Sequence, residues 1–277
     1  MFRAVVNVAT GEHYRKGQAR LARILDFDLD ILDLDTDLLL WEDLPHLDEG
    51  DNTAIYQIPA AWPSHRDKPY AFKAYALETA AQRGYDLLLW IDAAVKPVRS
   101  LEPLWERIER DGYWFAENAW NNYEWTADSA YPALFPTYGD WGVAGEVSRY
   151  ARNINRSVPH VIACAFGLNL RSAVGEHFLR EYYRLASETD AFCGPWWNSN
   201  NPANRDKDPG KSGPCGPPDV IGHRHDQTAA SLIAWRMGMR LTPGHRDPEG
   251  DILAYPEWFP ERKVPERCIL IHDGSMK

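Results

Sequence analysis

The stretch RGYDLLLWIDAAVKPV, residues 83–98, decides the fold. An unbroken apolar run from Leu87 to Ile91 follows Gly84 and ends abruptly on Asp92. Such a run is typical of a strand that is buried on both faces of a parallel sheet. Ligands of open α/β sheets bind at the carboxyl ends of the strands, so Asp92 is a candidate ligand contact. A buried strand can equally end on an aspartate that only caps the next turn, and this stretch alone favours neither interpretation.

The composition is that of an acidic, aromatic-rich chain. Its 277 residues can bury a large core, and no repeat or low-complexity linker divides them, so we expect a single domain over 1–277. Acidic residues outnumber basic ones by 40 to 30, a net charge of -10, which disfavours extensive contact with nucleic-acid phosphates. The 12 Trp and 13 Tyr suit stacking on sugars or bases as well as ordinary packing.

The four cysteines lie far apart and form no CxxC pair, which predicts reduced thiols rather than a disulfide framework. A zinc site built from Cys215, His223 and His225 is a minor alternative, because the spacing fits no standard ligand pattern. The first residues contain too short an apolar run for a signal peptide, and no stretch approaches membrane-spanning length. We therefore expect a cytoplasmic protein without membrane contact.

The remaining apolar segments complete an alternation of strands and helices. Residues 4–9 predict a first strand that turns at Thr10-Gly11, and 14–25 predict an amphipathic helix. Neither GxGxxG nor GxxxxGK[ST] follows this strand, so the sequence carries no dinucleotide fingerprint and no P-loop there. Later patterns predict strands within 26–44 and at 113–116, 158–170 and 268–271, and helices at 70–83, 101–110, 172–186 and 228–238. The result is an α/β fold with a central, mostly parallel sheet flanked by helices.

Two segments without periodicity are candidate binding loops. Residues 120–141 are dense in Trp, Tyr, Asn, Pro and Asp, which suits either an aromatic-walled sugar pocket or a rigid loop over the sheet edge. Residues 193–222 are rich in Pro, Gly, Asn and Asp, and structureless loops of this length are usually lids, binding loops or disordered. We expect a lid or acceptor loop at 193–222 and acceptor contacts from Asn118, Trp120, Asp140 and Trp141.

Charged residues lie at the ends of other elements. Asp226, in HRHDQ at 223–227, is at or near a helix N-terminus, where it either caps the helix or presents its carboxylate to a ligand. His272 and Lys277 follow the last predicted strand. A carboxylate and an imidazole can share a divalent cation, and a lysine can neutralise phosphate oxygens. Together with Asp92, these groups suit the stabilisation of a departing nucleotide diphosphate.

The order of these features resembles glycosyltransferases of the GT-A fold, with most similarity to family 8, the glycogenin and galactosyltransferase group. The similarity covers nearly the whole chain and is carried by Tyr14, Lys73, Asp92, Gly167, the pair Asp226-Gln227 and the ending His272-x-Gly274-x-x-Lys277. The chain also resembles bacterial and phage proteins of this fold whose strand ends in Asp-Ala-Ser or a similar triplet. The resemblance implies a GT-A-type, Rossmann-like fold and a transferase that uses a nucleotide sugar, with UDP as its nucleotide and with retention of anomeric configuration.

The resemblance also implies roles for individual residues. Asp226 and Gln227 would be the catalytic pair beside the transferred sugar. Asp92 and His272 would bind Mn²⁺ or Mg²⁺ beneath the diphosphate. The metal motif of the family is Asp-x-Asp, whereas this chain has Asp92-Ala93-Ala94, so we expect a weakened or absent cation site. Donor contacts would come from Thr10, Tyr14, Lys73, Asp92, Gly167 and Lys277.

Three other functions are compatible with the sequence. Without a second carboxylate in the triplet, the chain could be a non-catalytic module that binds nucleotide sugars or glycans. A nucleotidyltransferase fits less well, because no Gly-rich basic loop follows the first strand. The sequence assigns no acceptor class, whether glycan, small molecule, protein or modified DNA base, and no oligomeric state. A phage-type enzyme that glycosylates hydroxylated DNA bases would need a local basic groove, for which the candidates are Arg205, Lys207, Lys211, Arg224 and Arg236.

Overall fold

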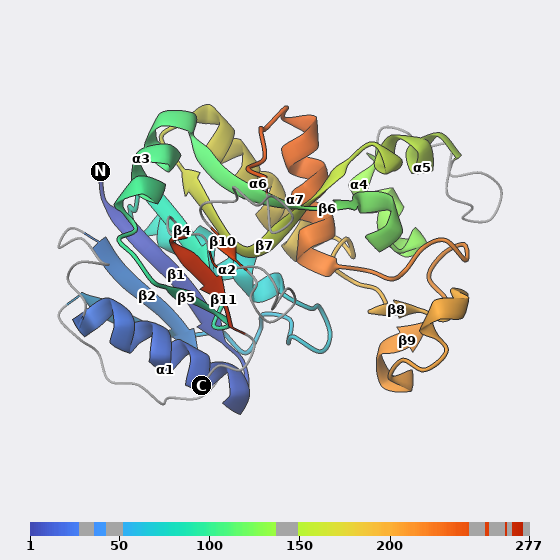
Figure 1. Ribbon diagram of the computed structural model, residues 1–277, viewed down its shortest axis with the longest axis horizontal. Helices are drawn as coiled ribbons and strands as arrows, with labels where there is room; N and C mark the ends of the chain where they lie inside the picture. Colours follow the sequence, from blue (N-terminus) through green and yellow to red (C-terminus); the bar gives the residue numbers. More distant parts are fainter. Residues whose placement is uncertain are drawn as a thin grey trace.

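A six-stranded, mostly parallel sheet forms the centre of the protein (Figure 1). The computed structural model describes residues 1–27, 36–42, 52–136, 149–243, 253–254, 264 and 268–273. The strand order is β3-β2-β1-β4-β7-β6, in which β1 to β4 are parallel and β7 runs antiparallel to both of its neighbours. The strands are β1 (Arg3–Ala9), β2 (Thr36–Glu42), β3 (Thr53–Gln57), β4 (Leu87–Ile91), β6 (Tyr113–Asn121) and β7 (Pro159–Asn169). The predicted α/β architecture is confirmed.

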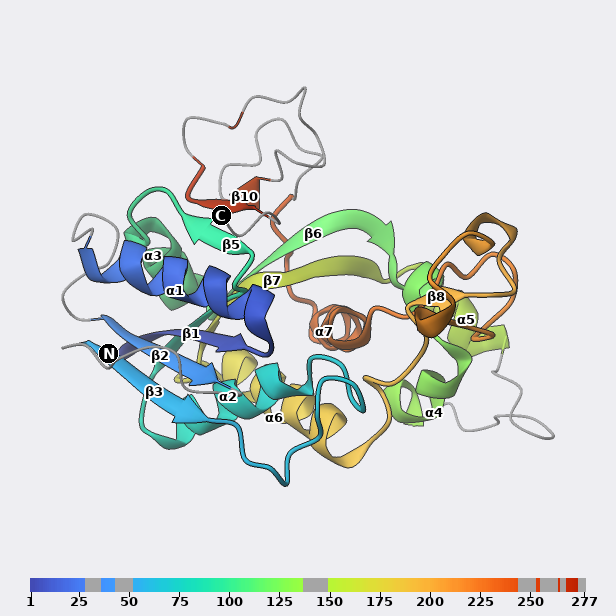
Figure 2. The same ribbon diagram turned by 90° about the horizontal axis from the view of Figure 1, so that it is seen from below.

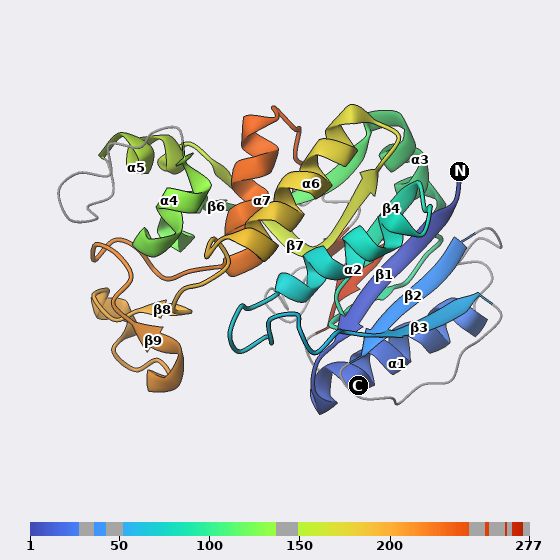
Figure 3. The ribbon, with the colours of Figure 1, turned by 180° about the vertical axis from the view of Figure 1, so that it is seen from behind.

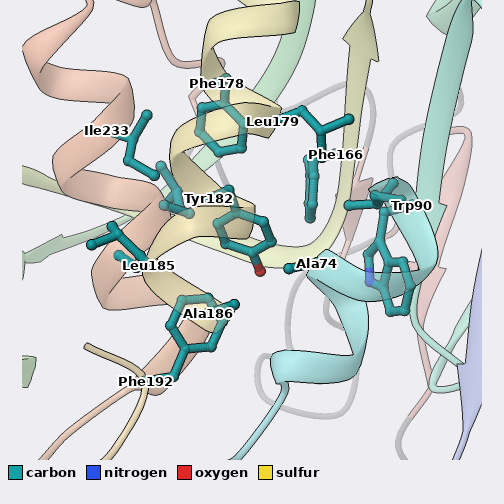
Figure 4. Packing of buried hydrophobic residues seen from close by; sticks show 14 of the residues in the cluster. Ala74, Trp90, Phe166, Phe178, Leu179, Tyr182, Leu185, Ala186, Phe192 and Ile233 are labelled. Carbon is teal, nitrogen blue, oxygen red and sulfur yellow. The ribbon is translucent and has the colours of Figure 1, made fainter. Parts of the chain in front are cut away.

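Helices cover both faces of this sheet (Figures 2 and 3). One face carries α1 (Glu12–Phe27) and α3 (Glu102–Asp111). The other carries α2 (Ala71–Gln82), α6 (Ala173–Glu188) and α7 (His225–Arg236). On this second face, rings from the sheet and from α6 pack together around Phe166, Phe178 and Tyr182 (Figure 4).

The opening stretch is a central strand. All five residues of β4 are buried. Leu88 and Trp90 belong to the apolar cluster under α2, α6 and α7, whereas Leu87, Leu89 and Ile91 belong to the cluster under α1 and α3. Because successive side chains of a strand point to opposite faces, burial of both faces requires the unbroken apolar run. β4 lies parallel to β1 on one side and antiparallel to β7 on the other.

Two smaller sheets flank the central one. The first joins β5 (Val95–Pro97) to β11 (Leu270–His272) in antiparallel register and β11 to β10 (Leu253–Ala254) in parallel. The second pairs β8 (Trp197–Asn198) with β9 (Ser212–Gly213) inside the segment 193–222. This segment lies at one end of the molecule with η1 (Asn122–Trp125), α4 (Tyr131–Leu134) and α5 (Arg149–Arg156) (Figure 1). Its role as a lid stays a prediction.

Asparagine side chains order much of the segment 193–222. The amide of Asn198 donates to the carbonyl oxygens of Gly216, Pro217 and Val220, and its own carbonyl accepts from the backbone N–H of Cys215. Such bonds satisfy backbone groups that have no ladder partner, which explains why a stretch without periodicity can fold locally. None of the helices in the described ranges is long and apolar enough to cross a membrane.

Candidate active site

A buried lysine joins two carboxylates at the carboxyl end of β4. The Nζ atom of Lys73 lies 3.0 Å from Oδ1 of Asp92 and 2.9 Å from Oδ2 of Asp226, which is in the first turn of α7. It also donates to the carbonyl oxygen of Ala163 at 2.7 Å. The ammonium thus has two carboxylate oxygens and one carbonyl oxygen within 3.0 Å. Lys73 is 2% exposed and positions the two carboxylates, and its expected contact with the donor stays a prediction.

Burial and mutual pairing shift the pKa values of Asp226 and Lys73. Burial raises the pKa of Asp226 to about 6, even though Lys73 lowers it. Burial alone would lower the pKa of Lys73, but Asp226 and Asp92 raise it above its ordinary value. At neutral pH the ammonium of Lys73 therefore lies beside the ionised carboxylate of Asp226.

Two aromatic side chains that the sequence reasoning missed enclose the lysine. Its Nζ lies 5.0 Å from the ring centre of Tyr70 and 5.2 Å from that of Trp90. The indole N–H of Trp90 also donates to Oδ1 of Asp92 at 2.7 Å. Trp90 precedes Asp92 by two positions, and residues two apart on a strand share a face, so the sequence held a signal for this contact. Trp90 thereby restricts the orientation of the carboxylate.

The helices that carry Lys73 and Asp226 both begin on a residue with left-handed backbone. Tyr70, before α2, has φ 62°, and His225, at the start of α7, has φ 46°. This region is uncommon for non-glycine residues and strained for bulky ones, and such strain clusters at functional sites. Nothing in the sequence signals it, because neither position holds Gly, Asn or Asp.

Two adjoining cavities meet at this cluster and share Tyr70, Asp92 and His272 as lining residues. The first cavity is called the nucleotide-side cavity because the expected donor contacts Thr10 and Tyr14 line it. It has a volume of about 240 Å³ and is also lined by His65, Phe72, Ala93 and Ala94. The second cavity is called the acceptor-side cavity because the expected acceptor contacts Asn118 and Trp120 line it. It has a volume of about 230 Å³ and is also lined by Lys73, Arg224, Asp226 and Gln227. Together they reach the range of about 300 to 1,000 Å³ that is typical of small-molecule sites. The structure thus brings together nine of the predicted site residues; Asp140, Trp141 and Lys277 lie outside the described residues.

The acceptor-side cavity has firmly held polar walls. Asn118 shares a 2.9 Å hydrogen bond with Nδ1 of His160, and its side-chain oxygen accepts from the backbone N–H of Trp120. Burial lowers the pKa of His160 to about 3, so the ring is neutral. The amide of Gln227 donates to the carbonyl oxygen of Val161. These bonds fix the side chains that face the cavity.

Gly167 does not belong to this site, and its predicted donor contact is corrected. It lies within β7, opposite Leu89 on one neighbouring strand and Trp114 on the other. A Cβ atom at 167 would collide with the side chain of Ile108 on α3. The close approach expected from the missing side chain is therefore real, but the approaching group is a core isoleucine.

The described residues do not fit a divalent cation held by the protein. Asp92 and His272 line both cavities, yet no group of three or more His, Cys, Asp or Glu side chains able to hold a metal occurs in the described ranges. Oδ1 of Asp92 is already bonded to Trp90 and close to the Lys73 ammonium. Position 94, where a second carboxylate would be needed, holds a buried alanine. We therefore assign no metal to Asp92 and His272.

The zinc alternative at Cys215, His223 and His225 is wrong. Both ring nitrogens of His223 contact the backbone, at the N–H of residue 127 and the carbonyl oxygen of residue 191. Nδ1 of His225 contacts the carbonyl oxygen of residue 192. These imidazoles tie loops to the helix α7 instead of converging on a common ligand position.

An ion-pair anchor holds His272 beside Asp92. The next residue, Asp273, donates its backbone N–H to the carbonyl oxygen of Ala94 at 2.6 Å. Its carboxylate lies 2.9 Å from Arg20 and 3.2 Å from Lys96. The anchor therefore ties β11 to α1 and to the turn after β4. Sequence reasoning missed it, because Arg20 and Asp273 are 253 positions apart.

Replacing Asp273 should reduce the stability of the protein without changing a residue that lines either cavity. We expect Asp273→Asn to lower the free energy of unfolding by about 1 to 3 kcal/mol, the value of hydrogen bonds to charged groups in partly buried positions. Urea unfolding measures this loss. The control is Asp111→Asn, which breaks the exposed pair with Arg110 and should change stability much less than Asp273→Asn does. Equal effects of the two variants would contradict the anchor.

The basic residues expected to line a groove for DNA come from the ends of α7 and from the segment 193–222. Arg224 and Arg236 stand at opposite ends of α7, and Arg236 donates to the carbonyl oxygen of Leu134. Lys207 and Lys211 lie in the segment 193–222, where each faces a tryptophan ring. Lys207 and Arg224 face the same ring, that of Trp197, whereas Arg236 lies at the other end of α7. A DNA acceptor stays a prediction.

The chain was also compared with known proteins. It matches no family in a scan of protein families, and it matches no curated protein sequence. Two solved structures are similar to it over most of their length. Mouse xyloside xylosyltransferase 1, in its apo form, is 10% identical with a TM-score of 0.48, covering 98% of this chain and 97% of its own. A glycosyltransferase involved in the glycosylation of the major capsid of PBCV-1 is 10% identical with a TM-score of 0.48, covering 98% and 92%.

Proposed function

We propose that the protein is a glycosyltransferase that moves a sugar from a UDP-sugar to a hydroxyl acceptor with retention of configuration. The observation that carries this proposal is the meeting of two cavities at paired carboxylates, Asp92 and Asp226. The nucleotide-side cavity lies at the carboxyl ends of β1 and β4, where nucleotides bind in open α/β sheets, and Tyr14 offers a ring for the base. The donor sugar would then reach Asp226 and Gln227.

The proposed reaction breaks the bond between the anomeric carbon and the diphosphate oxygen, and the electron pair of that bond leaves with the diphosphate. The acceptor oxygen forms the new bond to the anomeric carbon, and its proton passes to the departing phosphate oxygen. The carboxylates of Asp226 and Asp92 bind sugar hydroxyls and favour the positive charge that grows on the sugar. His272 contacts the diphosphate in this proposal, and no step uses a metal.

The test is binding and donor hydrolysis in parallel. We expect isothermal titration to detect UDP binding to the wild type, and we expect Asp92→Ala to reduce hydrolysis of its preferred donor by about a hundredfold. His272→Ala should weaken UDP binding. Glu188→Ala, an exposed carboxylate at the end of α6, is the control and should leave both measurements unchanged.

The outcomes separate the proposal from its alternatives. UDP binding without turnover of any donor in a panel of nucleotide sugars would favour the non-catalytic binding module. Turnover only with duplex DNA that contains hydroxylated bases would favour the phage-type enzyme. Absence of UDP binding, together with unchanged behaviour of Asp92→Ala, would overturn the proposal.

A further inference from the structure

Arg224 lines the acceptor-side cavity beside the catalytic pair and is enclosed by three tryptophans. It is the residue immediately before α7, two positions before Asp226. Its guanidinium carbon lies 4.2 Å from the ring centre of Trp125, 5.4 Å from that of Trp197 and 5.9 Å from that of Trp120. These rings come from η1, β8 and β6, so three separate elements build the enclosure. Trp120 and Trp125 also stack on each other, 4.7 Å apart.

The guanidinium has donors but no acceptors. Its buried Nε has no hydrogen-bond partner, and no described carboxylate forms an ion pair with Arg224. Two other partly buried arginines each have a carboxylate partner: Arg20 pairs with Asp273, and Arg152 with Asp128. Burial lowers the pKa of Arg224, as expected for a cation that has lost water. Unsatisfied buried donors are costly, and a bound ligand with acceptor oxygens would satisfy them.

The chemistry of the enclosure limits the class of ligand. A guanidinium stacked on an indole keeps its edge open, and that edge matches the two oxygens of a carboxylate or phosphate. The indole faces beside it suit the apolar faces of a saccharide ring. Lys207, whose Nζ lies 4.5 Å from the ring of Trp197, adds a second positive charge next to the enclosure.

Arg224 is also placed away from the diphosphate. It lines the acceptor-side cavity, and the nucleotide-side cavity of Thr10 and Tyr14 does not include it. Asp92, which lines both cavities, lies at their junction. The anion that Arg224 would bind is therefore a group carried by a saccharide rather than the leaving diphosphate.

We propose that Arg224 is a specificity-determining residue that recognises a carboxylate or phosphate group on a saccharide substrate. This inference rests on the proposed function. The oxyanion can belong to the acceptor or to the transferred sugar, since both would enter this cavity. The chain thus selects acidic saccharides over neutral ones.

Titration with matched probes tests the proposal and distinguishes the two sources. For the acceptor, methyl glucuronide is compared with methyl glucoside in the presence of UDP. For the transferred sugar, UDP-glucuronate is compared with UDP-glucose. We expect the acidic probe of one pair to bind the wild type about ten- to a hundredfold more tightly, the effect of a charge-assisted bidentate contact, and the pair that shows it identifies the source.

Two variants and a control complete the experiment. Arg224→Gln should abolish the discrimination while keeping UDP affinity, and Arg224→Lys, which keeps the charge but not the fork, should retain a part of it. Arg156→Gln removes an arginine that also stacks on a ring, that of Tyr123, but lies outside the cavities, and it should retain the full discrimination. Circular dichroism and thermal unfolding check that each variant folds.

Equal affinity of the wild type for acidic and neutral probes in both pairs would overturn the inference. Full discrimination in Arg224→Gln would overturn it as well. Discrimination that depends on Arg224 in a protein that does not bind UDP would instead refute the proposed function and leave Arg224 as an anion site for saccharides.

Discussion

Replacing Lys73 by methionine should lower the free energy of unfolding by about 3 to 5 kcal/mol, the cost of leaving buried charges without their partner. Lys73 is 2% exposed, and its ammonium contacts Asp92, Asp226 and a backbone carbonyl. Its removal therefore deprives three acceptors of this donor at once. Chemical denaturation at pH 7 measures the loss. The control is Lys16→Met on the exposed face of α1, where the pair with Glu12 contributes less than about 1 kcal/mol.

A second measurement on Lys73→Met separates loss of charge pairing from loss of packing. Without the ammonium, Asp92 and Asp226 repel each other, so protonation of one relieves the strain. The variant should therefore regain stability relative to the wild type between pH 7 and pH 5, and adding Asp226→Asn should restore a part of it at pH 7. A deficit that is independent of pH and of residue 226 would assign the effect to packing alone.

Asp226→Asn should reduce sugar transfer by about a hundredfold or more and remove the acidic limb of the pH profile. Burial raises the pKa of Asp226 to about 6, and the proposed role needs the carboxylate. Wild-type turnover should therefore rise with pH through about 6, whereas residual turnover of the variant should not show this rise. Steady-state rates between pH 5 and 8 measure the difference. If the pH profile of Asp226→Asn keeps its acidic limb at the same pH, the limb belongs to another group.

The same group makes a signed contribution to stability. Because its folded pKa of about 6 exceeds the ordinary value of 3.8, the folded state binds the proton more tightly than the unfolded state. This stabilisation is complete below pH 3.8 and is lost as the pH rises to about 6, a change of about 3 kcal/mol. Asparagine is neutral at every pH, so the stability of Asp226→Asn relative to wild type should increase over this window. Denaturation curves at pH 4 and pH 7 test the direction.

The sequence predicted the elements of the site better than their assembly. The apolar run before Asp92 identified β4, because a strand buried on both faces cannot alternate with polar residues. It could not identify the neighbour of β4, which is the antiparallel β7 that brings Ala163 to the lysine. It placed Asp226 near a helix start, but the helix begins at His225 in a left-handed conformation that has no composition signal.

Hydrophobic periodicity could not predict the other contacts of the site, because they depend on packing between segments that are distant in the sequence. Lys73 was expected at the donor, and only the position of α7 across the sheet shows that two carboxylates and a carbonyl already surround it. Gly167 illustrates the opposite error. A glycine in a strand predicts that another group approaches the backbone closely. The sequence does not say whether that group is a ligand or, as here, the side chain of the core residue Ile108.

One of the three partners of Lys73 constrains how this site can evolve. The carbonyl of Ala163 belongs to the main chain, so no substitution at 163 deletes it. A descendant that loses one carboxylate would still have a lysine with two acceptors. It would therefore retain enough stability for selection to act on a new specificity. A descendant that loses the lysine first would lose much more stability, because two carboxylates would then lack their counter-charge. As far as stability alone is concerned, either aspartate should therefore change before position 73 does.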